Sequence, residues 1–337
     1  MLPLSTPLPS LAVTYYTVSD HRFFLGTVAL LNSLRLTGNE GELVVLDVGL
    51  TARERELLSD HATVFAPPRQ VDVHPVMIKP YAHLCHTSGT AVMIDSDVIV
   101  TGSLGHVVAL ARDGQICAYP EQAVRGRWFA EWEKTLGLRA SLRRDTYVNA
   151  GLVAFSTDWW PHFLKRWGEV CERIPPGEMW GSRSPFQAPD QDALNALLMS
   201  EIRPEGLALL PETEASFRGN ITVEDIESLV CRVNGDMKTI LHYMDSPKPW
   251  ESSGWLRLAS TDYVRLMRRL LFANDVPLRL DSRQAPLWLR PGRLGELTLR
   301  LLGAGNRGGI WFARKVPGPL QDALRQLRRR AAGALAR

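Results

Sequence analysis

Two aspartates separated by one residue follow a short apolar run in the first third of the chain. Asp95 and Asp97 flank Ser96, directly after the apolar residues 91–94. Two carboxylates at this spacing can offer oxygen ligands to one divalent cation, and such hard ligands suit Mg²⁺ or Mn²⁺. Short acidic pairs also occur by chance in many turns, so this pair alone is a weak indication of a metal site.

Three further polar motifs follow the aspartate pair in order along the chain. They are Asn-Ala-Gly at residues 149–151, Asp-Gln-Asp at residues 190–192, and His242 followed six residues later by Lys-Pro-Trp at residues 248–250. An imidazole added to two carboxylates shifts the preference of a site toward Mn²⁺. The four motifs together are far more specific than any one of them.

In this order the motifs resemble those of the family 8 glycosyltransferases, which include glycogenin and the bacterial lipopolysaccharide galactosyl- and glucosyltransferases. The resemblance covers roughly residues 11–250. It implies a GT-A fold, a UDP-sugar donor, Mn²⁺ as the metal, and transfer of a hexose to a saccharide or other glycan with retention of configuration. Breaking the anomeric C–O bond leaves negative charge on the β-phosphate, and a nearby cation stabilises that charge.

The resemblance also implies a role for each motif residue. Asp95 is expected to contact the ribose of the donor and the metal. The metal is expected to be held by Asp95, Asp97 and His242, and the diphosphate to be neutralised by Lys248. The residues expected around the transferred sugar are Asn149, Ala150, Asp190 and Gln191.

A retaining transfer needs a group beneath the sugar ring, and Asp190 and Gln191 are the two catalytic candidates. An amide is a poor nucleophile, so front-face attack by the acceptor stays open as an alternative. Upstream, Asp20 follows the first strand where this family binds uracil, and Lys79 precedes Asp95 as a basic donor-contacting residue does in similar proteins. The structural alternatives are a turn-stabilising Asp20 and a surface Lys79.

One position departs from the family pattern. Asp245 stands three residues after His242, where the family has a glycine that lets bare backbone approach the phosphates. A carboxylate there puts donor affinity in question and keeps a non-catalytic nucleotide-sugar-binding protein open as an alternative. A sugar-nucleotide nucleotidyltransferase is a second alternative, although residues 17–22 are not the Gly-rich phosphate loop expected of one. Trp128 and Trp132 are predicted acceptor contacts, because loops between motifs commonly shape that site.

The elements that must position these residues follow from the apolar pattern. Strands are predicted at residues 11–17, 43–48 and 62–65, with a helix at residues 24–36 and another opened by a capping box at residues 51–54. This alternation predicts a doubly wound, mostly parallel sheet. Residues 91–94 fit a central strand buried on both faces, and ligands gather at the carboxyl ends of such strands.

The second half of the chain continues the pattern less regularly. A strand is predicted at residues 151–155, and a helix is predicted to begin at Asp190 as its N-cap. A last strand at residues 239–243 carries His242. We therefore expect a catalytic GT-A domain over residues 1–250 and a basic, mainly helical region over residues 251–337.

Charge is distributed unevenly between these two parts. Residues 251–337 hold 17 Lys or Arg against 6 Asp or Glu, although the whole chain carries only +3. Such a region predicts contact with an anionic surface, either lipid headgroups or nucleic acid, and a solvated arginine-rich helix is the alternative. The amphipathic spacing of residues 319–337 favours the membrane surface over nucleic acid.

The expected location is the cytoplasm, with the protein lying on the inner membrane face if a membrane is involved. The four cysteines are widely spaced and form no CxxC pair, which argues against a disulfide framework and a zinc ribbon. The first ten residues lack the pattern of a secretory signal, and no stretch approaches the roughly 20 apolar residues that a spanning helix needs.

Overall fold

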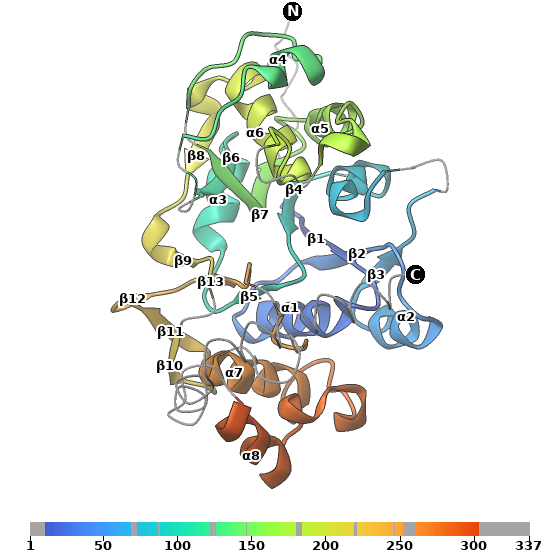
Figure 1. Ribbon diagram of the computed structural model, residues 1–337, viewed down its shortest axis with the longest axis vertical. Helices are drawn as coiled ribbons and strands as arrows, with labels where there is room; N and C mark the ends of the chain where they lie inside the picture. Colours follow the sequence, from blue (N-terminus) through green and yellow to red (C-terminus); the bar gives the residue numbers. More distant parts are fainter. Residues whose placement is uncertain are drawn as a thin grey trace, which may run out of the picture.

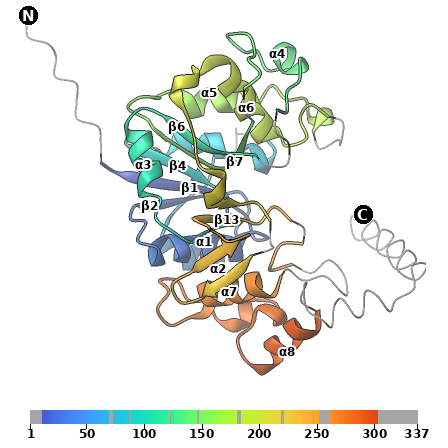
Figure 2. The ribbon, with the colours of Figure 1, turned by 90° about the vertical axis from the view of Figure 1, so that its left-hand side faces the viewer.

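The computed structural model describes residues 11–302, apart from 69–72, 87, 122–123, 125, 146, 180–183, 219–220, 246 and 252–259. Over this part the chain folds around a seven-stranded sheet with helices on both faces (Figures 1 and 2). The predicted α/β class is confirmed.

The central sheet is mostly parallel, with the strand order β3-β2-β1-β4-β7-β6-β8. Neighbours from β3 to β4 run parallel, and so do β6 and β8, whereas β7 is antiparallel to both β4 and β6. Its strands are β1 (Val13–Ser19), β2 (Glu42–Asp47), β3 (Thr63–Phe65), β4 (Thr90–Ile94), β6 (Ile116–Pro120), β7 (Val148–Ser156) and β8 (Leu207–Leu209).

Alternate residues of each strand enter different cores, as a period of two requires. Val92 and Ile94 of β4 belong to the core beneath α1 (Phe24–Leu36) and α3 (Gly105–Arg112). Ala91 and Met93 belong to the opposite core, beneath α5 (Phe163–Cys171) and α6 (Pro189–Glu201). All of β4 is buried, which confirms the prediction of a central strand covered on both faces.

Several predicted element boundaries are confirmed and others need correction, among them the first strand, which spans Val13–Ser19 and not residues 11–17. The helix α1 has the predicted bounds, and α2 (Ala52–Ser59) opens with the capping box between Thr51 and Glu54. The strand β7 begins at Val148, three residues before its predicted start, so that Asn149 and Ala150 lie inside the sheet. Asp190 is not an N-cap, because the helix α6 starts at Pro189 with Ala188 in the cap position, two residues earlier than predicted.

Two small sheets lie beside the central one. The first joins β5 (Val98–Val100), β13 (Ile240–His242) and β9 (Ala215–Ser216), with β13 antiparallel to β5 and parallel to β9. The second is an antiparallel ribbon of β10 (Thr222–Asp225), β11 (Val230–Val233) and β12 (Asp236–Met237). The predicted last strand therefore exists, but it belongs to a small sheet and not to the central one.

The remaining described helices are short or lie near the end of the described chain. The helix α4 spans Glu131–Thr135. Short 3₁₀ helices span Pro75–Met77, Lys79–Leu84, Pro176–Glu178, Pro204–Gly206, Glu212–Glu214, Ser282–Gln284 and Leu287–Leu289.

After residue 260 the chain packs against α1. The helix α7 (Thr261–Phe272) contributes Tyr263, Leu266 and Leu270 to the core that α1 also lines. The fully buried Asn32 of α1 donates hydrogen bonds to the carbonyls of Leu270 and Leu278 and accepts one from the Leu278 N–H. Buried polar groups are costly unless bonded, so this amide ties the segment to α1.

The helix α8 (Arg293–Leu302) follows and leaves Leu294 and Leu297 exposed. The predicted amphipathic segment at residues 319–337 lies outside the described residues. Among the described residues, no helix has both the length and the apolar character needed to cross a membrane.

Candidate active site

The aspartate pair lies in a tight turn at the carboxyl end of β4. The Asp95 N–H donates to the carbonyl of Gly151 on β7 at 3.0 Å, and the Val98 N–H donates back to the Asp95 carbonyl at 3.0 Å. The strand β1 lies next to β4, and on its other side the chain order reverses toward β2 and β3. Ligands in open α/β sheets bind at such switch points, at the carboxyl ends of strands.

The pairing of β13 with β5 brings a histidine from much later in the chain to this turn. His242 pairs with Val98, the residue after Asp97, and the Tyr243 N–H donates to the Asp97 carbonyl at 3.1 Å. His242 Nε2 then lies 3.6 Å from Asp95 Oδ2 and 3.3 Å from Asp97 Oδ1. One ligand atom from each of these three side chains lies within 4.8 Å of the other two.

This donor set fits a divalent cation. An octahedral ion with bonds of about 2.1 Å places adjacent ligand atoms roughly 3 Å apart, close to the distances from His242 Nε2 to the two carboxylates. Two carboxylate oxygens and an imidazole nitrogen suit Mn²⁺ and accommodate Mg²⁺ less well. The three predicted metal ligands are therefore brought together by the fold.

Lys248 reaches the same carboxylates from the chain beyond β13. Its ammonium donates to Asp97 Oδ2 and to the Tyr243 carbonyl, each at 2.6 Å. Burial alone would raise the pKa of Asp97, but His242 and Lys248 outweigh it and hold that pKa well below its usual range. Asp97 is thus kept as an anion, which is the form that binds a cation.

Lys79 lies inside the molecule, so the alternative of a surface lysine is wrong. Its side chain is 4% exposed, and its ammonium is 2.7 Å from Asp95 Oδ1, 3.1 Å from Asp190 Oδ2 and 3.0 Å from the Ala150 carbonyl. Burial would lower the pKa of Lys79, but the two carboxylates outweigh it and raise that pKa. The buried ammonium of Lys79 therefore contacts three of the predicted site residues, namely Asp95, Asp190 and Ala150.

The residues predicted around the sugar gather where α6 meets β7. Gln191 Oε1 accepts the Ala150 N–H at 3.0 Å, and Asn195 of the same helix bonds both the N–H and the carbonyl of Val148. These side chains bond the backbone of β7 beyond Leu152, where its pairing with β4 ends. Burial raises the pKa of Asp190, although Lys79 beside it acts in the opposite direction.

Asn149 is 1% exposed and both ends of its amide contact protein groups. Its Nδ2 donates to Glu121 Oε2 at 2.7 Å, and its Oδ1 accepts the Gly151 N–H at 2.8 Å. The same Oδ1 lies 3.1 Å from His242 Nδ1. Asn149 therefore contacts a metal-ligand candidate directly.

Two other residues singled out from the sequence, Asp20 and Asp245, are not part of the buried cluster. Asp20 Oδ1 accepts the Phe23 N–H at 3.0 Å, which stabilises the turn before α1. Asp245 is exposed, on the segment between His242 and Lys248.

Gly26 of α1 allows Trp250 and the Ser96 carbonyl to pack closely on the helix, because a Cβ at this glycine would lie only 2.3 Å from that carbonyl.

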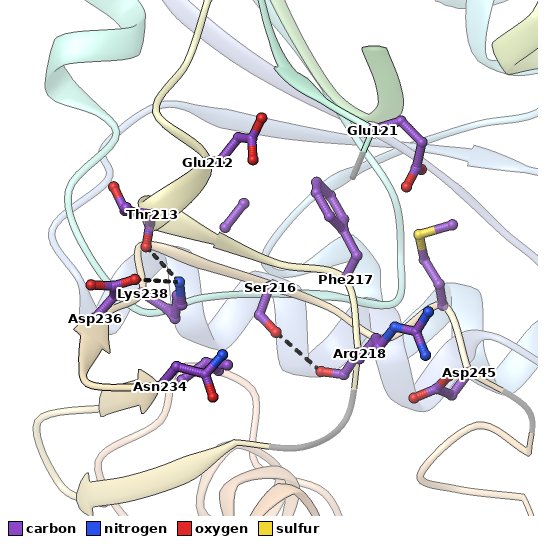
Figure 3. A pocket seen from close by; sticks show the side chains of 13 residues that line it. Glu121, Glu212, Thr213, Ser216, Phe217, Arg218, Asn234, Asp236, Lys238 and Asp245 are labelled. Carbon is purple, nitrogen blue, oxygen red and sulfur yellow. Dashed lines mark hydrogen bonds and ion pairs between the residues drawn. The ribbon is translucent and has the colours of Figure 1, made fainter. Parts of the chain in front are cut away.

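A cavity of about 610 Å³, which was not predicted, lies beside His242. Figure 3 shows the side chains that line it. Phe217 lines it and packs edge-on against the His242 ring, with centroids 6.0 Å apart. Glu121 lines it as well and reaches Asn149. Other lining residues include Ser216, Arg218, Met244 and Asp245. The strand β9 supplies Ser216, and the ribbon of β10 to β12 supplies Val233 and Asp236. No motif marks these two segments in the sequence.

The tryptophan predictions fare differently. Trp132 is fully buried and its indole N–H donates to the Pro185 carbonyl at 2.8 Å, so its prediction as an acceptor contact is wrong. Trp128 is partly buried, with the Arg144 guanidinium 4.5 Å from its ring centroid. Neither tryptophan lines the cavity.

Comparison with known proteins gives matches in structure only. No protein-family model and no curated protein matches the sequence. The bifunctional glycosyltransferase WbbM, in its apo form, superposes with a TM-score of 0.52 over 80% of this chain and 51% of its own, at 16% identity. The apo form of the glycosyltransferase GlyE from Streptococcus pneumoniae TIGR4 gives 0.51 over 78% of this chain and 61% of its own, at 14% identity.

This chain thus spans about half the length of WbbM and somewhat more of GlyE. At these identities the likeness concerns the fold. The chain has the mixed α/β fold of GT-A glycosyltransferases, with a mostly parallel seven-stranded sheet.

Proposed function

We propose that this protein is a retaining glycosyltransferase that moves a hexose from a UDP-sugar to a saccharide or other glycan, with Mn²⁺, or Mg²⁺ in its place, as the metal. The observation that carries the proposal is the meeting of Asp95, Asp97 and His242 at the carboxyl end of β4, on a fold of this kind. The family 8 resemblance of the motifs supports the same assignment.

In the proposal these three side chains hold the ion. A bound divalent cation would stabilise the charge that develops on the β-phosphate as the anomeric C–O bond breaks. Lys248 is the group that adds a second positive charge to those oxygens, and its present distance of 2.6 Å from Asp97 places it beside the metal ligands. Asp97 receives its low pKa from His242 and Lys248 and stays ionised throughout.

The donor contacts are proposed from the same arrangement. Asp95 contacts the ribose, and Asp20 accepts the uracil N–H with the oxygen that does not hold the turn. Lys79 keeps Asp95 and Asp190 at a fixed separation beneath the sugar, since it is within 3.1 Å of both. Asn149 and Ala150 line the floor at the end of β7.

Retention of configuration is proposed to proceed through front-face attack by the acceptor. Gln191 Oε1 already accepts a buried backbone N–H from Ala150, and nucleophilic attack by that oxygen would break this bond. Asp190 is paired with the buried Lys79 and orients that lysine. In this proposal both side chains position the site, and the leaving phosphate accepts the proton of the incoming hydroxyl.

The acceptor is proposed to bind in the cavity beside His242. Its volume of about 610 Å³ suits one or two sugar units, and its carboxylate and guanidinium groups can bond hydroxyls. The acceptor is further proposed to meet the enzyme at an anionic membrane surface on the cytoplasmic side. The excess of Lys and Arg over residues 251–337 and the exposed Leu294 and Leu297 of α8 support this contact.

The test is a donor screen in which UDP release is followed with each UDP-sugar and Mn²⁺. We expect release with at least one donor, its loss in Asp97→Ala and His242→Ala, and its loss on chelation. The anomeric configuration of the product, read by NMR, tests retention. Glu56→Ala, a change at an exposed surface ion pair with Arg53, is the control and should behave as wild type.

Other outcomes separate the competing functions. Pyrophosphate-dependent turnover would favour a sugar-nucleotide nucleotidyltransferase. Binding of a UDP-sugar without turnover on a broad acceptor panel would favour a non-catalytic nucleotide-sugar-binding protein. Co-sedimentation with anionic but not neutral vesicles tests the membrane contact separately.

A further inference from the structure

The imidazole of His242 makes a second contact on the side away from the aspartates. His242 Nδ1 lies 3.1 Å from Asn149 Oδ1, whereas Nε2 faces Asp95 and Asp97. A neutral imidazole carries its proton on one nitrogen only, and only the other nitrogen can bind a metal. A group that keeps the proton on Nδ1 therefore leaves the lone pair of Nε2 available to a metal ion.

The orientation of the Asn149 amide decides where that proton lies. The Gly151 N–H can only donate, and it lies 2.8 Å from Asn149 Oδ1. The Glu121 carboxylate accepts, and its Oε2 lies 2.7 Å from Asn149 Nδ2. A flipped amide would place its oxygen against the carboxylate and its NH₂ group against the backbone N–H, so both neighbours oppose the flip.

The position of Glu121 is fixed well enough to orient the Asn149 amide. It directly follows β6, it is 2% exposed, and its backbone N–H donates to the Tyr147 carbonyl at 2.9 Å. Met244 Sδ, 3.4 Å from Asn149 Nδ2, is a second acceptor for the same NH₂ group. The carboxylate is thus a buried part of the sheet and not a mobile surface group.

We propose that Glu121 is a positioning residue that, through Asn149, keeps the proton of His242 on Nδ1 and presents Nε2 to the metal. Gly151 serves the same end, since it supplies an N–H to Asn149 and a side chain there would collide with the imidazole. Groups behind a ligating histidine typically change metal affinity 10- to 100-fold when they are removed. This inference rests on the metal site of the proposed function.

The first test locates the proton on the imidazole of His242. The protein is labelled with ¹⁵N-histidine, and His242 is identified as the signal missing from His242→Gln. Long-range ¹H–¹⁵N correlations of the protein saturated with diamagnetic Mg²⁺ should show the proton of His242 on Nδ1 and none on Nε2. A His242 that carries its proton on Nε2 under these conditions would overturn the proposal.

The second test compares variants in Mn²⁺ titrations and in the same spectra. Glu121→Ala should populate the other tautomer and bind Mn²⁺ about 10- to 100-fold more weakly. Glu121→Gln, whose amide oxygen can still accept from Asn149, should retain the wild-type tautomer and most of the affinity. Glu212→Ala removes a carboxylate from the same cavity without contact to Asn149, and controls for the loss of charge.

An unchanged tautomer and unchanged Mn²⁺ affinity in a folded Glu121→Ala would refute the role of Glu121. Weakening of equal size in Glu121→Ala and Glu212→Ala would also refute it, because it would show a general charge effect. If the wild type binds Mn²⁺ and shows the Nδ1–H tautomer but transfers no sugar, the proposed function fails while this inference stands.

Discussion

Gly151 gives the sharpest test of the site, because it fills the space behind His242. A methyl group on this glycine would lie 2.3 Å from His242 Nδ1, 2.4 Å from Cε1 and 2.7 Å from Asn149 Oδ1. The glycine lies within β7 and shows no positive φ, so alanine meets no backbone obstacle there. In Gly151→Ala the strain therefore falls on the imidazole and the amide.

The size of the effect follows from these distances. Ordinary van der Waals contact begins at 3.4 Å, so the imidazole must retreat by about 1 Å. Metal–ligand distances tolerate only about 0.2 Å. A misplacement of about 1 Å can cost roughly 100-fold in rate, and we expect a loss of that order in kcat/KM. Overpacking in a buried strand should lower the free energy of unfolding by about 1–3 kcal/mol, which leaves the protein folded.

The assay measures Mn²⁺ affinity, UDP release and urea unfolding on the same preparation of Gly151→Ala. The matched control is Gly177→Ala, because a Cβ on Gly177 has no atom within 4 Å and its φ is not positive. The control should match the wild type in all three measurements. A Gly151→Ala protein with wild-type Mn²⁺ affinity and turnover would refute the idea that His242 is held against this glycine as a ligand.

Three further changes probe the same architecture. Asn32→Ala should lower the free energy of unfolding by about 2–4 kcal/mol in urea titrations, because it orphans buried partners at Leu270 and Leu278; a loss under 1 kcal/mol would contradict this. Lys79→Met should lower the free energy of unfolding of the metal-free protein by about 3–5 kcal/mol, because Asp95 loses its positive partner. Bound Mn²⁺ should restore part of that loss by supplying positive charge beside Asp95; an equal stabilisation of variant and wild type by Mn²⁺ would argue against this. Chelation should abolish UDP release while far-UV circular dichroism stays unchanged, and Mn²⁺ at about 100 times its Kd should raise Tm by roughly 5 °C; unfolding on chelation would contradict the reasoning.

Local signals in the sequence predicted the elements that depend on neighbouring residues. The bounds of α1, the capping box at Thr51 and the buried strand before Asp95 all follow from apolar spacing and from side chains a few positions apart. The three metal-ligand candidates were predicted from a resemblance in motif order. Their mutual approach within 4.8 Å agrees with that prediction.

Features set by contacts between distant segments could not be read from the sequence. An apolar run has the same period in either direction, so the antiparallel orientation of β7 left no signal. The pairing of β13 with β5 depends on register between segments far apart in sequence. Residue type alone would place Lys79 on the surface, because lysine is rarely buried unless it is paired with acidic groups. Here Asp95 and Asp190 are those acidic groups, and both lie far from Lys79 in sequence.

Asp190 was mistaken for an N-cap for a related reason. Aspartate is favoured both at that position and within the first turn, and the proline before it also fits the first helical position. Pro189 takes the first helical position here, which moves the start of α6 by two residues and leaves the Asp190 side chain to pair with Lys79. The incorrect N-cap prediction therefore concerned Asp190, the residue that connects α6 to Lys79.

The short β5–β13 ladder also dictates when the site can exist during synthesis. His242 leaves the ribosome about 145 residues after Asp97, which at about 5–20 residues per second is a delay of roughly 7–30 s. Until then the nascent chain contains Asp95 and Asp97 without His242. A nascent chain that ends before His242 therefore lacks one of the three candidate ligands, and the proposed metal site can be completed only after residue 242 has been made.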